Sequence, residues 1–396
     1  MSLGEIVVRK RIALSMGPGG VGKTTIAGAM GLQAAVEGRR ALVLTIDPAM
    51  RLADALGLSS LKPGQRHVLD SAALSAAGVP ARAELAVSML DADRTWQAVI
   101  AREVSDPDKR RMILEHPFFQ RICDDLAGAR DYAAVEEIHH LDSRGEFDLV
   151  VLDTPPTVYG VSFLEAPDRL LGVLDHNAYR LLLGPALLAS KVGLRTWSFS
   201  GGYVIRKLSR FTGIEFLRQL ASFTDLFSGL LEGFRQRAAT VKARLRSGAA
   251  GFVVVTAADS NLAREAGYLY RRLQQRDLSP EAVIVNRVTP RPTPLQADGA
   301  WRDELRERLG RDGERWLEAL ERAHATLDAL ARRDAAALEA IKASMPRSSS
   351  FQTVPLMDGD IHDLRGLERL RRALFDPGCP DGSDAPAGET RRTGSC

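Results

Sequence analysis

The sequence has little cysteine and no long apolar run. Its three cysteines, Cys123, Cys379 and Cys396, are far apart and form no C-x-x-C pair, which excludes a disulfide framework and indicates a reducing compartment. No apolar stretch reaches the roughly 18 residues that a transmembrane helix needs. The apolar run at the N-terminus is too short for the core of a secretory signal. We therefore expect a soluble, cytoplasmic protein.

The charge of the chain is nearly balanced. The formal net charge is +3 over 396 residues, and aromatic residues make up only 6%. The sequence has no basic stripe with interleaved aromatic residues, so no nucleic-acid partner is expected. Hydrophobic residues at 45% and charged residues at 26% are ordinary for a globular protein. The length predicts either two domains or one domain with an insertion.

Short apolar runs alternate with helical patterns along the chain. Buried parallel strands have such runs, and the alternation predicts an α/β fold with a doubly wound, mostly parallel sheet. A helix over Thr24–Glu37, closed by Gly38, connects the first two strands in a right-handed βαβ unit. Residues Glu84–Leu90 could add a strand. The five predicted strands are Ile12–Met16, Ala41–Thr45, Asp148–Asp153, Phe252–Thr256 and Ala282–Asn286.

The remaining segments predict the domain organisation. We expect one α/β domain over 1–375, with helical insertions at about 92–146 and 160–247, and a disordered tail over 376–396 that is rich in Gly, Pro, Ser and charge. The second insertion carries a stripe of large apolar side chains at helical spacing. This stripe is either the core of a helical subdomain or a groove for an apolar partner. Its members are Phe216, Leu220, Phe223, Phe227, Leu231 and Phe234.

The strongest motif is a phosphate-binding loop. Gly17 to Thr24 reads GPGGVGKT, which matches G-x-x-x-x-G-K-[ST] directly after a strand and at the start of a helix. The glycines let successive N–H groups point at phosphate oxygens, and the helix N-terminus adds its positive dipole end. Lys23 should bridge the β- and γ-phosphates of ATP, and Thr24 should bind Mg²⁺. The predicted nucleotide-binding residues here are Gly17, Gly19, Gly20, Val21, Gly22, Lys23, Thr24 and Thr25.

Two aspartates follow predicted strands and complete the predicted catalytic set with Lys23. Asp153 ends the strand in DLVVLDTPP, at the carboxyl edge of a parallel sheet where ligands bind, so it should share the magnesium ion with Thr24. Asp47 follows the second strand in TIDPA, and Pro48 keeps it out of a helix. Asp47 could orient or deprotonate the attacking water, or it could be a helix cap. Its spacing does not separate these readings.

The motifs occur together in an order that resembles a known family. GPGGVGKTT, TIDPAMRLADALGL, FDLVVLDTPPT, AVIVNRV and VPLMDGDIHDLRGLERL are similar to the ArsA-type branch of the SIMIBI P-loop ATPases, over about 1–375. That group includes arsenite-pump ATPases, factors that target tail-anchored proteins, and bacterial ArsA-like anion-transporting ATPases, which are the nearest match. The resemblance implies that Asp47 orients the water, that Asn286 reads adenine, and that the loop at Pro355 covers the base.

Three departures from the family pattern concern partners. Pro18 stands where many of these loops have a lysine that reaches the nucleotide of the partner subunit. Arg51 could replace that cation, or it could be a solvated arginine at a helix start. The C-x-x-C of the targeting factors is missing, as is a cysteine cluster for arsenite, so neither a zinc site nor an arsenite site is expected. The single phosphate loop implies a homodimer, or a heterodimer with a paralogous ATPase.

The sequence therefore predicts a magnesium-dependent ATPase whose hydrolysis opens and closes a dimer. One alternative is a weakly hydrolysing regulatory subunit paired with a paralogue, which the missing lysine favours. The other is a targeting factor that shields an apolar client helix, for example of a membrane protein. The sequence names neither the cargo or anion nor the partner.

Overall fold

A computed structural model describes residues 1–117, 119–120, 123, 129–155, 165–166, 222–223, 226–295, 299–345 and 349–376. Within these residues the chain forms an eight-stranded sheet in the order β3-β4-β2-β5-β1-β6-β7-β8. Every neighbouring pair is parallel except β3 and β4. The strands are β1 (Ile12–Met16), β2 (Ala41–Thr45), β3 (Arg66–Leu69), β4 (Leu85–Met89), β5 (Leu149–Asp153), β6 (Ala250–Ala257), β7 (Ala282–Val288) and β8 (Ser350–Pro355).

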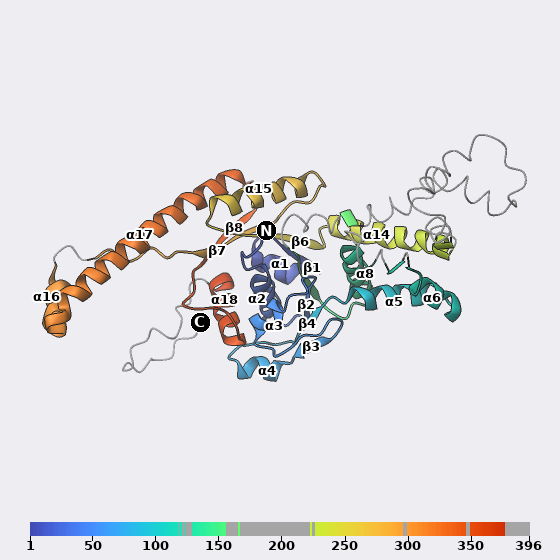
Figure 1. The fold of residues 1–396 in the computed structure, drawn as a ribbon, viewed down its shortest axis with the longest axis horizontal. Coiled ribbons are helices and arrows are strands. Elements are labelled where there is room, and N and C mark those ends of the chain that lie inside the picture. The colour runs from blue at the N-terminus through green and yellow to red at the C-terminus, as the bar shows by residue number, and fades with distance from the viewer. Residues whose placement is uncertain are drawn as a thin grey trace, which may run out of the picture.

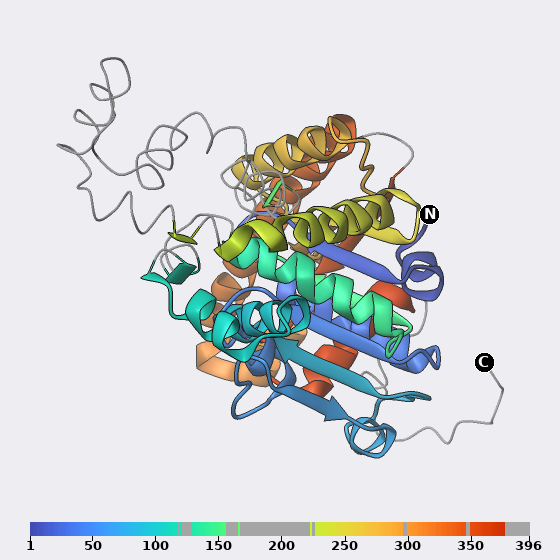
Figure 2. The same ribbon diagram turned by 90° about the vertical axis from the view of Figure 1, so that its right-hand side faces the viewer.

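Helices cover both faces of the sheet (Figures 1 and 2). Alternate residues of each strand point to opposite faces, so a strand that is buried on both sides is apolar throughout. In β1, Ala13 faces one core, whereas Ile12, Leu14 and Met16 face the other. The first core is closed by α1 (Leu3–Arg9), α2 (Lys23–Val36), α3 (Arg51–Leu56), α4 (Ser71–Ala76) and α18 (Leu364–Phe375).

The opposite face carries the helices that follow β4, β5 and β6. Aromatic rings pack between them: Trp96 stacks on Tyr132 with ring centroids 5.4 Å apart and meets Phe234 edge-on at 5.8 Å. Phe227 stacks on Phe234 at 5.5 Å. These helices are α5 (Ala92–Glu103), α6 (Pro107–Leu114), α8 (Ala129–Arg144), η1 (Ser228–Leu230), α14 (Leu231–Arg246) and α15 (Ser260–Gln274).

This aromatic core bears on the predicted apolar stripe. Phe223, Phe227 and Phe234 are buried in the core, as the subdomain-core reading expects. Phe216 and Leu220, like most of the predicted 160–247 insertion, lie outside the described residues, and so does the predicted tail beyond Asp376. Among the described helices, none is long and apolar enough to cross a membrane.

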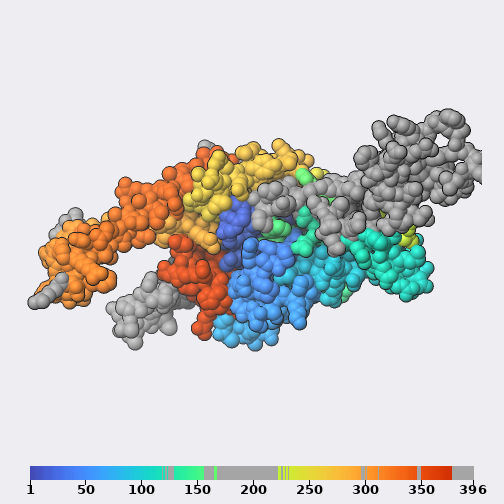
Figure 3. Space-filling view, viewed as in Figure 1, coloured from blue at the N-terminus to red at the C-terminus, as the bar shows by residue number. Residues whose placement is uncertain are grey.

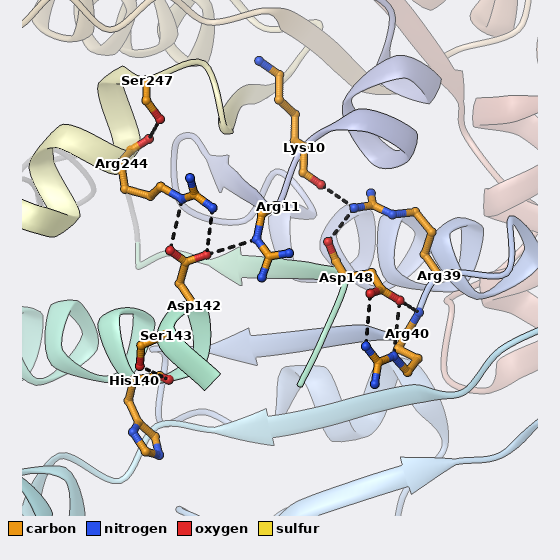
Figure 4. Close-up of polar contacts among 10 residues, drawn as sticks. All are labelled: Lys10, Arg11, Arg39, Arg40, His140, Asp142, Ser143, Asp148, Arg244 and Ser247. Carbon is orange, nitrogen blue, oxygen red and sulfur yellow. Dashed lines mark hydrogen bonds and ion pairs between the residues drawn. The ribbon is translucent and has the colours of Figure 1, made fainter. Parts of the chain in front are cut away.

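Arg39 joins the carboxyl end of α1 to the amino ends of β1 and β5. Its guanidinium donates to the backbone carbonyls of Val7, in the last turn of α1, and of Lys10 and Asp148, just before β1 and β5. The neighbouring Arg40 pairs with the carboxylate of Asp148 at 3.2 Å (Figure 4). One half-buried arginine thus fixes the edge of the sheet opposite to the phosphate loop.

A helical arm projects from the body after β7 (Figures 1 and 3). It consists of α16 (Ala300–Leu309), η2 (Gly310–Asp312) and α17 (Gly313–Ser344). Near the body, Ile341 is buried in the core and the carboxylate of Asp334 accepts a 2.9 Å hydrogen bond from Thr289 N. Farther out, Trp316 is 58% exposed. The arm is therefore anchored at its base, directly after β7.

The predicted sheet is confirmed, with additions. The five predicted strands are present, β1 and β2 have the predicted bounds, and the possible strand at Glu84–Leu90 is β4. β3 and β8 were not predicted. The first two strands are not adjacent, because β5 lies between β1 and β2.

Candidate functional site

The loop between β1 and α2 has the shape of a phosphate cradle. Gly20 and Gly22 have φ of +75° and +92°, which glycine adopts without steric cost. A Cβ on Gly17 would collide with the carbonyl of Val255, so only glycine fits there. The loop leads directly into the N-terminus of α2, whose unpaired N–H groups and dipole favour an anion. The sequence–structure context that the motif requires is present.

Lys23 lies inside this loop. Its side chain is buried, and its Nζ donates to the Pro18 carbonyl at 2.8 Å. Burial lowers the pKa of Lys23, whereas the nearby negative charges of Asp153 and Asp47 raise it. The loop therefore holds an ammonium group that has no carboxylate in direct contact among the described residues. Such a group is suited to neutralise phosphate charge.

Asp153 and Thr24 form the best-defined polar contact of the site. Asp153 is 1% exposed, and its Oδ2 accepts hydrogen bonds from Thr24 Oγ1 at 2.8 Å and from Thr45 Oγ1 at 2.9 Å. Its Oδ1 is buried and has no hydrogen-bond partner among the described residues. Burial raises the pKa of Asp153 to about 6 against the hydrogen bonds of the two threonines, which lower it.

A magnesium ion fits these groups. Mg²⁺ prefers hard oxygen ligands and is bound in such loops by a hydroxyl and, directly or through water, by a carboxylate. The hydroxyl of Thr24 and the unpartnered Oδ1 of Asp153 supply that donor set. A cation at this place would offset the cost of burying the carboxylate.

Asp47 lies in the turn after β2. Its Oδ1 accepts from Ala49 N at 3.0 Å, and its Oδ2 accepts from Arg51 Nη1 at 3.0 Å. Asp47 N in turn donates to Thr45 Oγ1 at 3.2 Å. The carboxylate stabilises the turn, but it is not the N-cap, because Met50 occupies that position of α3. Arg51 starts α3 and pairs with Asp47.

Comparisons with known proteins match the part of the chain that holds the site. The family described as "Anion-transporting ATPase" matches residues 10–185, which include the loop, Asp47 and Asp153. This part of the chain is similar to the anion-transporting ATPase family, the ArsA type. Its sheet and phosphate loop are those that the resemblance implied.

Individual relatives of the chain are distant. It is 28% identical over 302 residues to an uncharacterized protein of Streptomyces coelicolor, covering 72% of this chain and 65% of the relative. It is 25% identical over 283 residues to ATPase GET3 of Malassezia globosa, covering 71% and 74%. It is 26% identical over 199 residues to the arsenical pump-driving ATPase of Escherichia coli, covering 49% and 31%. The match thus spans less than two thirds of the Streptomyces and Escherichia proteins.

Asn286 lies on the other side of the ArsA-type phosphate loop, at the end of β7. Its Nδ2 donates to Val21 O at 2.9 Å, and its Oδ1 accepts from Arg287 N at 2.9 Å. A Cβ on Gly22 would collide with this amide, so loop and side chain fit closely. Asn286 therefore braces the loop, and one N–H remains beyond the bond to Val21.

The other predicted residues lie in the loop, at the start of α2 and at the end of β8. Thr25 is half-buried in the first turn of α2, and Gly19 is exposed in the loop. Pro355 ends β8, where it pairs in register with Val288. Pro18 is buried, so the position of the intersubunit lysine is occupied by a ring inside the protein. Lys23, Thr24, Asp153 and Asn286 thus contact the loop or one another, whereas Pro355 is placed only by its pairing with Val288.

Two residues of this site were missed from the sequence. Thr45 joins Asp47 to Asp153 through one hydroxyl. The signal was its position: Thr45 and Asp153 are register partners at the ends of neighbouring parallel strands. Arg287 Nη1 donates to Gly20 O at 3.3 Å. No local sequence pattern indicated Arg287, because its partner, Gly20, lies far away along the chain.

Proposed function

We propose that this chain hydrolyses ATP with magnesium and that hydrolysis drives the opening and closing of a dimer. The observation that carries the proposal is the buried pair of Asp153 and Thr24, with an unpartnered carboxylate oxygen, beside Lys23 in a phosphate loop. The similarity of residues 10–185 to the ArsA-type ATPase family supports the same activity. The geometry of the site supports the hydrolysis of ATP. The dimer is inferred from the presence of a single phosphate loop in the sequence.

The residues divide the work of phosphoryl transfer. Backbone N–H groups of Gly19 to Thr24 bind the β- and γ-phosphates, and Lys23 leaves the Pro18 carbonyl to contact them. When bound, magnesium neutralises charge that develops on the phosphate oxygens. Asp153 and Thr24 hold and orient that ion. The protein contributes positioning and electrostatic stabilisation rather than covalent chemistry.

Asp47 orients the attacking water in this proposal. Each carboxylate oxygen of Asp47 accepts one hydrogen bond and has a second lone pair for water. Of its two partners, Arg51 is the one that can leave, because its side chain is 61% exposed. Release of Arg51 would free Oδ2 for water while Ala49 N keeps Oδ1 in place. The same release would free the Arg51 guanidinium to contact phosphate across a dimer, where Pro18 cannot.

A weakly hydrolysing regulatory subunit is the second candidate. Two observations favour it: Pro18 is buried, and both carboxylate oxygens of Asp47 are engaged. A pairing with a paralogue would then supply the missing cation. A targeting factor with an apolar client groove depends on residues that lie largely outside the described ones.

The test is to measure Mg·ATP binding and turnover for three proteins: wild type, Lys23→Ala and Asp47→Asn. Lys23→Ala should lose turnover and most of its affinity, because the phosphates lose a buried cation. Asp47→Asn should keep its affinity and lose turnover by roughly a hundredfold or more, as expected for a residue that handles the attacking water.

The outcomes separate the candidates. Wild-type turnover that rises with protein concentration supports the homodimer. Turnover that appears only with a paralogous chain supports the regulatory subunit. Unchanged hydrolysis in Lys23→Ala would refute the assignment of the loop, and equal loss of binding and turnover in Asp47→Asn would make Asp47 a structural residue.

A further inference from the structure

Arg287 occupies an irregular position at the end of β7. Val285 pairs with Thr353 of β8, but Val288 pairs with Pro355, so β7 has one residue more than β8 between these pairs. Arg287 has φ of +58°, in the left-handed region that non-glycine residues rarely adopt. Bulges of this kind redirect side chains and are frequent beside functional sites. Here the bulge turns Asn286 and Arg287 toward the phosphate loop.

Both redirected side chains contact the loop. Asn286 Nδ2 donates to Val21 O, and Arg287 Nη1 donates to Gly20 O. Asn286 is buried by its contacts, whereas Arg287 is exposed. Among the described residues the guanidinium of Arg287 makes one long hydrogen bond, at 3.3 Å, although it has five N–H donors. The remaining donors and the flat face of the group are available beside the loop.

The sheet order places Arg287 on the nucleoside side. The groups suited to magnesium and the attacking water, Asp153 and Asp47, follow β5 and β2, on one side of β1. β6, β7 and β8 lie on the other side. A nucleotide whose γ-phosphate faces Asp153 must extend its ribose and base away from that group. The base therefore comes to the ends of β7 and β8, where Arg287 lies.

We propose that Arg287 binds the nucleoside part of the nucleotide by laying its guanidinium plane against the base, while its bond to Gly20 holds the loop. The inference rests on the proposed ATPase function. Guanidinium groups stack on aromatic faces, and such contacts strengthen binding by about tenfold when they are shielded from water. Arg287 thus adds a platform next to Asn286 without taking part in the hydrolysis.

Inorganic tripolyphosphate tests this division, because it carries the phosphates of ATP without the nucleoside. Calorimetric affinities for Mg·ATP and Mg·tripolyphosphate are compared in wild type, Arg287→Ala and Arg287→Lys. Arg287→Ala should bind ATP about tenfold more weakly but tripolyphosphate within about twofold of wild type. Arg287→Lys keeps a donor for Gly20 but lacks the flat group, so ATP binding should stay weakened.

A matched control is Arg291→Ala, which removes a neighbouring arginine whose side chain is 78% exposed and lies 3.9 Å from Asp328. It should change neither affinity. Equal weakening of both ligands in Arg287→Ala would overturn the inference and make Arg287 a brace of the loop only. Unchanged ATP binding would overturn it as well. A wild-type protein that binds neither ligand would instead refute the proposed function, and the inference with it.

Discussion

Replacing Asp153 by asparagine should stabilise the free protein while it removes the carboxylate of the proposed magnesium site. Burial raises the pKa of Asp153 from 3.8 to about 6. The folded state therefore binds this proton more tightly than the unfolded state, and ionisation of Asp153 opposes folding. The cost is absent below about pH 4, grows as the pH rises toward 6, and is complete above it. Two pKa units correspond to about 3 kcal/mol at pH 7.5.

Asparagine removes the charge but keeps the shape. Its carbonyl oxygen can accept from Thr24 and Thr45 as Oδ2 does, and its amide takes the place of the unpartnered Oδ1. Without nucleotide and magnesium, Asp153→Asn should therefore be more stable than wild type by up to about 3 kcal/mol at pH 7.5. At pH 5 the difference should fall to roughly 1.5 kcal/mol.

Urea unfolding at pH 5, 6, 7 and 8 measures this difference. Asp47→Asn is a control, because Asp47 is less buried and its two oxygens are partnered. Mg·ATP should reverse the order, since it stabilises wild type but not Asp153→Asn. A variant that is less stable than wild type at pH 7.5, or a difference that does not change with pH, would refute the reasoning.

Two further predictions concern hydrogen bonds on opposite edges of the sheet. Thr45→Val removes a donor that lowers the pKa of Asp153. The acid limb of the ATPase pH profile should therefore move to higher pH, and turnover at pH 7 should fall roughly tenfold. The control is Thr256→Val, whose buried hydroxyl has no partner among the described residues, and it should change neither the pH profile nor the turnover. Arg39→Ala leaves three backbone carbonyls without their donor and should lower the free energy of unfolding by about 2–4 kcal/mol, whereas Arg40→Ala removes an exposed pair and should cost less than about 1 kcal/mol in the same denaturant titration. An equal effect of the two arginine variants, or of the two threonine variants, would contradict the respective prediction.

The central strands could be predicted from the sequence because both of their faces are buried. Ile12–Met16 and Ala41–Thr45 are buried at every residue, which produces an uninterrupted apolar signal. The edge strands β3 and β8 lack that signal: Arg66–Leu69 and Ser350–Pro355 each have a single fully buried residue. Their position depends on hydrogen bonds to β4 and β7, which the local sequence does not encode.

The site shows the same limit. The phosphate loop, Asp47 and Asp153 could be predicted because each follows a recognisable strand. Thr45 and Arg287 depend on contacts with residues far along the chain, Asp153 and Gly20. An arginine in left-handed conformation also runs against local preference, so only the tertiary structure explains it. The sequence likewise did not predict that Asp47 accepts a hydrogen bond from Arg51.

The arm after β7 has a mechanical consequence. Thr289, two residues beyond Arg287, is bonded to Asp334 near the base of α17, so the end of the nucleotide-side strand and the helix are joined directly. Trp316 lies 18 residues farther out on the same helix, which is about 27 Å at the rise of an α-helix. A rotation of about 10° at Asp334 would carry Trp316 through roughly 5 Å. A small rotation at the end of β7 would therefore displace the far end of α17, at Trp316, by about the length of a side chain.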